Sequence, residues 1–176
     1  MFNINEVVIE DMTSDKFAEV ADLELLLEKD HGDTIIEEEL HEMFDTESLY
    51  AQYHGKVAVL DGEVIGYSIW VEAKVGSVGV QSVYRIAVRE DYRREGIGSK
   101  LMSAIDTSEH PVLAEVPETQ YEKMAFLKAN GFVVTRLEEA VYEDDDEDPI
   151  IPAYFVMRKE RKPELTLENR LKWRAP

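Results

Sequence analysis

Two arginines and two glycines lie in one short turn, in the order Arg93-Arg94-Glu95-Gly96-Ile97-Gly98. An apolar stretch that ends at Val88 precedes this turn, and a helical pattern over 99–106 follows it. Glycine permits positive φ angles and a close approach of the backbone. Guanidinium groups and the free N–H groups at the start of a helix attract anions. These residues therefore predict a binding site for a pyrophosphate group.

Two other glycine-rich phosphate turns do not match this order of residues. A dinucleotide fingerprint requires a third glycine at the position of Leu101. A Walker loop requires Gly-Lys-Ser/Thr, whereas Gly98 is followed by Ser99 and then Lys100. The remaining alternative is an ordinary strand–turn–helix corner that binds nothing.

The spacing of apolar residues predicts one domain over 1–159 and a basic tail over 160–176. The expected fold class is α/β, with a single mixed, mostly antiparallel central sheet flanked by helices, in the order β-α-α-β-β-β-α-β-α-β-β. Asp61-Gly62 predicts a tight hairpin, and Thr34 with Glu37 predicts a capping box. The expected strands cover 6–9, 56–60, 64–71, 82–88, 112–116, 132–142 and 153–158, and the expected helices cover 13–27, 34–44, 99–106 and 120–129.

The chain has 176 residues, a net charge of −19 and no cysteine. The lack of cysteine excludes a disulfide scaffold and a thiol nucleophile. The charge argues against nucleic-acid binding and favours a cationic partner, a small molecule or a basic protein segment, unless it serves solubility alone. No apolar run reaches the roughly 18 residues that span a bilayer, and residues 1–10 have no basic leader region. We therefore expect a cytoplasmic protein without membrane partners.

The turn and the strand before it resemble the GNAT superfamily of acyl-CoA-dependent N-acyltransferases. The family motif Arg/Gln-x-x-Gly-x-Gly/Ala is matched by residues 93–98, and the order of elements agrees over residues 7–157. The resemblance implies that acetyl-CoA is the cosubstrate and that its pantetheine arm pairs, like an added strand, with Ile86, Ala87 and Val88. It also implies that the pyrophosphate lies against Arg93, Arg94, Glu95, Gly96, Ile97, Gly98, Ser99 and Lys100.

Acetylation of an amine requires a base for the ammonium and a proton for the leaving thiolate. The resemblance to the branch that acetylates N-terminal amines places a catalytic base at Glu115, which ends a strand. A carboxylate held in a polar pair is the alternative reading of Glu115. Leu127 stands where many members carry a tyrosine acid, so Tyr121, Tyr84 or water must protonate the thiolate. A backbone N–H near Val88 can stabilise the oxyanion.

The histidines, the acidic run and the basic tail give less specific predictions about function. The four histidines share no ligand spacing, so we expect no metal. The acidic run 143–148 reads as a solvated loop or as one side of an amine-binding cleft. Leu171 and Trp173 in the basic tail predict docking onto the same chain or association into a homodimer.

The expected function is that of an N-acetyltransferase that works by direct attack in a ternary complex. The acceptor is a primary amine: a protein lysine or N-terminus, a polyamine or another small cationic amine. Acidic helices between Asp15 and Glu47 would flank it. The alternative, motivated by Leu127 and the negative charge, is a catalytically weak or inactive protein of the same fold that acts as an acidic binding or inhibitor module.

Overall fold

The computed structural model describes residues 3–31, 34–46, 51–75, 78–105, 110–140 and 153–159. The acidic run 143–148 and the basic tail 160–176 lie outside the described residues. The strands are β1 (Val8–Asp11), β2 (Ala51–Leu60), β3 (Glu63–Val75), β4 (Val78–Val88), β5 (Val112–Pro117), β6 (Val133–Glu138) and β7 (Tyr154–Lys159). The helices are α1 (Phe17–His31), α2 (Glu37–Asp45), α3 (Ile97–Ser103) and α4 (Tyr121–Ala129), with short 3-10 turns η1 (Ile4–Glu6), η2 (Ser14–Lys16) and η3 (Glu90–Tyr92).

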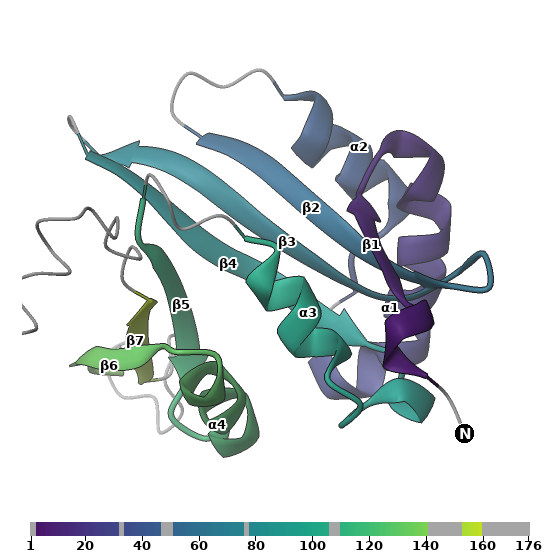
Figure 1. Cartoon of the computed structure of the whole chain (residues 1–176). Coiled ribbons are helices and arrows are strands. Elements are labelled where there is room, and N and C mark those ends of the chain that lie inside the picture. Colours follow the sequence, from purple (N-terminus) through teal and green to yellow (C-terminus); the bar gives the residue numbers. More distant parts are fainter. Residues whose placement is uncertain are drawn as a thin grey trace, which may run out of the picture.

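One mixed sheet carries all of the described strands, in the order β1-β2-β3-β4-β5-β7-β6 (Figure 1). Every neighbouring pair is antiparallel except β4 and β5, which run parallel. The order of helices and strands agrees with the sequence-based expectation, and the predicted fold class is confirmed. Among the helices of these ranges, none combines the length and the apolar character that crossing a bilayer would require.

Helices cover both faces of the sheet, and alternate strand residues supply the two cores. Helices α1 and α2 pack on one face, where Phe17, Val20 and Leu40 belong to one buried cluster with Tyr67 and Ile69. On the other face α3 packs over β2, β3 and β4 (Figure 1). A third cluster joins α4 to β5 and β7 and includes Val112, Ala114, Val116, Leu127 and Met157.

Of the two local signals predicted from the sequence, the hairpin turn is confirmed and the helix cap is wrong. The Asp61-Gly62 hairpin between β2 and β3 is confirmed, with φ angles of 52° and 87°, since two positive φ angles are what a type I′ turn needs. The predicted capping box at Thr34 and Glu37 is wrong, because α2 begins only at Glu37. There the Ile36 N–H donates to the Glu39 carboxylate at 3.1 Å, so the capping acid lies two residues later than expected.

Strands β4 and β5 are joined over three residue pairs and then separate (Figure 1). The last pair is Val83 with Ala114. On the other side of β4, Trp70 faces Val83 whereas Ile69 faces Arg85, so Tyr84 is an extra residue in a β-bulge. A bulge bends its strand and increases the local twist. The bulge therefore lies where β4 turns away from β5, and beyond it both strands have an unpaired edge toward the other.

Candidate active site

The unpaired edge of β4 has a definite set of backbone groups. The Arg89 N–H donates to the Ile65 carbonyl at 2.9 Å. Because bonded and non-bonded pairs alternate along an antiparallel ladder, the backbone groups of Ala87 point to β3, and those of Ile86 and Val88 point toward β5. The Val88 carbonyl accepts a bond from Arg93 Nε at 2.9 Å, in agreement with this direction. Both groups of Ile86 and the N–H of Val88 thus remain as the edge that an extended ligand can use.

The turn after β4 adopts the conformation that its glycines predict. Gly96 has a φ of 86° and is the N-cap of α3, and Arg94 has a φ of 67°. The first intrahelical bond runs from the Lys100 N–H to the Gly96 carbonyl. The N–H groups of residues 97–99 therefore have no partner within the helix, as is usual for a first helical turn.

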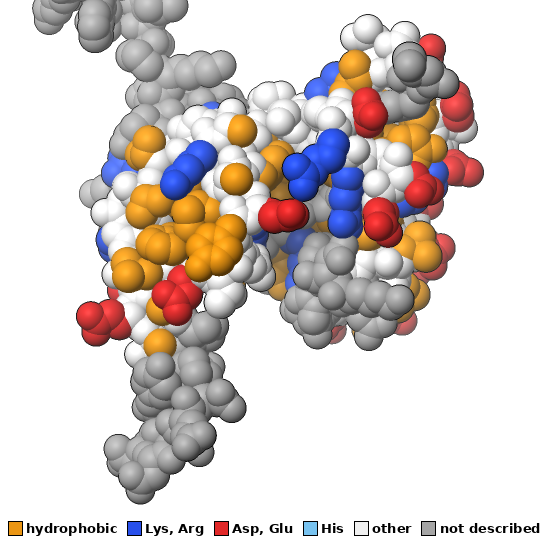
Figure 2. Space-filling view, turned by 90° about the horizontal axis from the view of Figure 1, so that it is seen from below, with side chains coloured by type: hydrophobic (Ala, Val, Ile, Leu, Met, Phe, Trp, Pro, Cys, Tyr) orange, Lys and Arg blue, Asp and Glu red, His pale blue; other side chains and the backbone are white. Residues whose placement is uncertain are grey.

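Some of the residues predicted to bind the cofactor have side chains that are not exposed at the surface of the turn. Ile97 is buried and packs in the core below α3. Lys100 Nζ donates to the carbonyl of Ile4 at 2.6 Å and to that of Val7 at 3.3 Å, which ties α3 to the N-terminal segment. Of these side chains, Arg93, Arg94, Glu95 and Ser99 are exposed. Figure 2 shows Lys and Arg side chains gathered near the middle of the face seen from below, with acidic side chains beside them.

Helix α4 approaches this turn from the β5 side. Arg94 Nη2 lies 3.5 Å from Glu122 Oε1 on α4. A Cβ placed on Gly98 would lie 3.1 Å from the Phe126 ring. A side chain at Gly98 thus requires the ring to move, so this glycine is needed for packing against α4.

Glu115, the predicted base, lies on β5 beyond the point where the strands separate. Val112, Ala114 and Val116 are buried against α4, so alternation places the exposed Glu115 on the opposite face of the sheet. Arg85 of β4 points to that same face, because it pairs with Glu24 of α1. Beyond Val83 and Ala114, β4 and β5 are no longer paired, and we call this opening the gap. The carboxylate of Glu115 and the guanidinium of Arg85 therefore flank the gap from its two sides.

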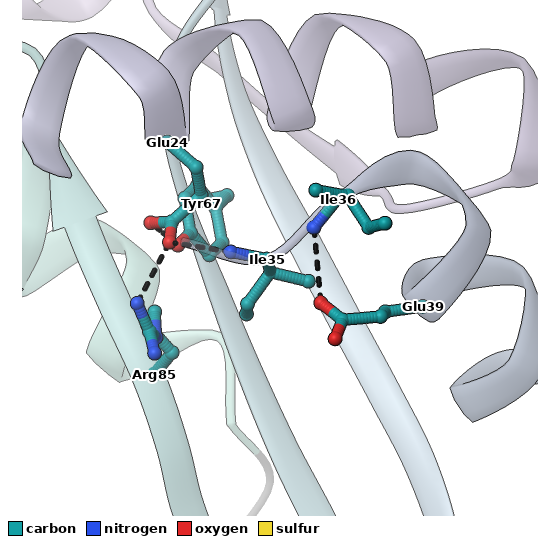
Figure 3. Close-up of polar contacts among 6 residues, drawn as sticks. All are labelled: Glu24, Ile35, Ile36, Glu39, Tyr67 and Arg85. Carbon is teal, nitrogen blue, oxygen red and sulfur yellow. Dashed lines mark hydrogen bonds and ion pairs between the residues drawn. The ribbon is translucent and has the colours of Figure 1, made fainter. Parts of the chain in front are cut away.

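A buried polar network holds Arg85 in place (Figure 3). Glu24 of α1 is fully buried. Its carboxylate accepts hydrogen bonds from Tyr67 Oη, from Arg85 Nη1 at 2.7 Å and from the Ile35 N–H at 3.3 Å. The carboxylate of Glu24 thus connects four parts of the chain: α1, the segment between α1 and α2, β3, and β4. It also compensates the charge of Arg85.

The two tyrosines considered as acids lie largely in solvent. Tyr121, at the first position of α4, is 74% exposed, and Tyr84, at the bulge, is 48% exposed. The Tyr84 ring contacts Tyr53 edge-on, with centroids 5.9 Å apart. The assignment of Tyr121 as an acid stays a prediction, and its exposure does not favour a role inside the gap.

Lys123 is a further ionisable residue at the gap, and the sequence analysis did not identify it. It is half-buried on α4. Burial lowers the pKa of its ammonium below 10.5, the charge of Arg85 lowers it further, and Glu115 acts in the opposite direction. The ammonium of Lys123 therefore interacts electrostatically with one residue of β4 and one of β5.

A signal for Glu24 and for Lys123 is present in the sequence. Glu24 falls on the apolar stripe of its helix, with Val20 four residues before it and Leu27 three residues after it. Lys123 precedes Leu127 by four residues and so lies on the same face of α4. A charge within an apolar stripe marks a residue that needs a buried partner. Within the described ranges, no group of three His, Asp or Glu side chains is arranged to hold a metal ion.

Comparisons with known proteins agree with this geometry. Residues 47–134, half of the chain, match the family model of the acetyltransferase (GNAT) domain. No curated protein matches the sequence significantly.

Solved structures have the same fold at low identity. Ard1 from Thermoplasma volcanium is 21% identical and has a TM-score of 0.62, over 88% of this chain and 97% of its own. The ribosomal-protein-S18-alanine N-acetyltransferase from Escherichia coli is 15% identical with a TM-score of 0.64, over 91% and 98%. Naa50 from Arabidopsis thaliana, in complex with the bisubstrate analogue CoA-Ac-MVNAL, is 16% identical with a TM-score of 0.64, over 88% and 99%. With the family model, these likenesses lead to one conclusion: the chain belongs to the GNAT family of acetyl-CoA-dependent N-acetyltransferases.

Proposed function

We propose that this enzyme transfers the acetyl group of acetyl-CoA to the α-amino group at the N-terminus of a peptide or protein. The separation of β4 and β5 behind the Tyr84 bulge is the observation that carries the proposal. It leaves backbone edges of both strands without a partner strand, to which an extended thioester arm can bond, and ionisable side chains of both strands lie beside these edges.

The residues on the β4 side suit acetyl-CoA. The free backbone groups of Ile86 and the free N–H of Val88 form an edge to which the amides of pantetheine can bond as an added strand. The free N–H groups of residues 97–99, with the exposed Arg93 and Arg94, suit a pyrophosphate. Bound there, acetyl-CoA supplies the activated acyl group, and the N–H of Val88 can donate to the thioester oxygen.

On the β5 side, Glu115 is the proposed base. It removes a proton from the acceptor ammonium, directly or through water, so that a neutral nitrogen can attack. The strand holds Glu115 in register, opposite Val156 of β7. The two bound substrates lie side by side, and this positioning supplies much of the rate.

One observation favours a polypeptide N-terminus among primary amines. Two structural neighbours are named for such acceptors, one for an alanine of ribosomal protein S18 and the other for its complex with a CoA conjugate of the peptide MVNAL. The net charge of −19 favours a cationic acceptor through long-range steering, as a basic peptide with a free α-amine would be.

The test measures release of free thiol from acetyl-CoA with paired peptides. One peptide of each pair has a free α-amine and no lysine, and the other has a blocked N-terminus and one lysine; spermidine is included. We expect transfer to the free α-amine, located by mass spectrometry, and a fall of about 100-fold or more in kcat/KM for Glu115→Gln. Transfer to lysine or spermidine alone would refute the assignment of the acceptor, and turnover unchanged in Glu115→Gln would refute the base.

A further inference from the structure

Strand β6 has three large apolar side chains in solvent. It is the last strand in the order of the sheet, and within the described residues its one ladder is with β7. Val133, Val134 and Leu137 are 56%, 40% and 51% exposed, so half of this six-residue strand consists of exposed apolar residues. The outer edge of a sheet presents backbone groups to which another strand can bond. Strand β6 is therefore a surface that a further segment can cover.

Two of these side chains continue the core that lies under α4. Val134 is opposite Met157 of β7, and Leu137 is opposite Phe155. Residues opposite each other across a ladder share one face of the sheet, and both partners pack in the cluster that contains Leu127 of α4. In Figure 2, hydrophobic side chains gather at the left of the face seen from below, the side on which α4 and β6 lie in Figure 1. The exposed part of β6 is thus the margin of an existing core.

The basic tail, which lies outside the described residues, contains a sequence that fits such a surface. Apolar residues occupy alternate positions, and polar residues occupy the positions between them. The first series is Leu165, Leu167, Asn169, Leu171 and Trp173, with one polar member, and the second is Thr166, Glu168, Arg170 and Lys172. A period of two is typical of a strand with one apolar face. A helix would instead turn Leu165 and Leu167 roughly 200° apart.

The connection from β7 to this segment is short but long enough. Lys159 ends β7, and its ammonium lies 5.9 Å from the ring centroid of Phe132, the residue before β6. The four residues 160–163 reach roughly 13 Å when extended. The outer edge of β6 lies two strand spacings from β7, which is about 10 Å. A short connection also gives the segment a high effective concentration at β6.

The charge of the chain favours its own tail over a second copy as the occupant of this edge. Residues 160–176 have five basic and three acidic side chains, whereas the whole chain has a net charge of −19. The rest of the chain therefore attracts the tail, and two whole copies repel each other.

We propose that residues 164–173 bind along the outer edge of β6 of their own chain as an added strand. The apolar side chains of the segment cover Val134 and Leu137, and its backbone bonds to the backbone groups of the edge. The added strand extends the core under α4 beyond β6. It also protects the edge from pairing with strands of other molecules, which is a common need of edge strands.

Because the chain has no cysteine, introduced cysteines test the proposal directly. Leu137→Cys is combined with a second cysteine at each of the positions 164–173 in turn, and disulfide formation under mild oxidation is followed by non-reducing electrophoresis and peptide mass spectrometry. We expect cross-linked monomers. The fastest odd-numbered position should react about 10-fold or more faster than the even-numbered positions beside it, because one face of the segment meets Leu137. Equal rates at odd and even positions, no cross-link, or cross-links that join two chains would overturn the proposal.

Hydrogen exchange of the full chain gives a second measurement. Leu167→Asp places a charge on the apolar face of the segment, and the matched control Thr166→Asp places the same charge on its polar face. We expect the amides of residues 133–138 to exchange faster in Leu167→Asp than in the wild type, and at the wild-type rate in Thr166→Asp. The same exchange in both variants would contradict the proposed strand. Neither measurement uses acetyl-CoA, so both decide this proposal independently of the proposed function.

Discussion

The two sides of the gap between β4 and β5 are built differently. On the β4 side, the groups proposed to bind acetyl-CoA are mainly backbone N–H and C=O groups, beside the bulge, the left-handed turn and the network around the buried Glu24. On the β5 side, the residues proposed for proton transfer act through their side chains, and Glu115 and Tyr121 are exposed. The proposed cosubstrate side thus depends on backbone geometry and a buried ion pair. The proposed proton-transfer side depends on exposed side chains of a short strand and a helix.

This difference predicts where substitutions cost stability and where they cost rate. A buried ion pair that loses one partner leaves an uncompensated charge, whereas an exposed pair contributes little. Changes on the β4 side should therefore lower the free energy of unfolding, and changes on the β5 side should lower the rate of catalysis with little effect on stability.

The largest effect on stability is expected for Glu24→Ala. Its removal leaves Arg85 and Tyr67 buried without their shared acceptor, at a cost of about 3–5 kcal/mol in the free energy of unfolding. Urea denaturation followed by fluorescence measures this cost. The matched control is Glu122→Ala, which removes the exposed partner of Arg94 and should change the unfolding free energy by less than about 1 kcal/mol. Equal costs for the two variants would mean that the two sides do not differ as described.

A smaller loss of stability is expected for Gly98→Val. The new Cβ would lie 3.1 Å from the Phe126 ring, and such overpacking costs about 1–3 kcal/mol. We also expect acetyl-CoA to raise the melting temperature of the wild type and to leave that of Gly98→Val unchanged. Combining Gly98→Val with Phe126→Ala should relieve the clash and yet leave the acetyl-CoA response impaired. A full response in the double variant would show that Gly98 serves packing alone.

The smallest effect, and one of opposite sign, is expected for Lys123→Met. The pKa of Lys123 is lowered in the folded protein, chiefly by burial, so folding at neutral pH carries the cost of a partly desolvated charge. Unfolding curves should show Lys123→Met to be more stable than the wild type at neutral pH. The difference should shrink as pH rises between the folded pKa and 10.5, because only the unfolded wild type still binds the proton there. A variant less stable at neutral pH would contradict this account.

The features that the sequence predicted are those that depend on local backbone rules. The Asp61-Gly62 hairpin, the Gly96 turn and the order of helices and strands along the chain follow from residue types within a few positions of one another. The bulge at Tyr84 could not be predicted, because it appears only when β3 and β4 are paired. Glu24, Arg85 and Lys123 come from three distant elements, and the sequence alone does not bring them together. The cap at Glu39 was missed because two acidic residues nearer to Thr34 compete for the same role.

The short ladder between β4 and β5 has a mechanical consequence. Within the described residues, the ladder between β4 and β5 has three residue pairs, from Gln81 with Val112 to Val83 with Ala114, and it joins the β1–β4 part of the sheet to the part formed by β5, β7 and β6. A thioester arm laid along the free edge would act as a temporary eighth strand and would stiffen this seam. Bound acetyl-CoA would then act as part of the sheet, and the release of CoA after each round of catalysis would return the enzyme to a form with fewer bonds between β4 and β5.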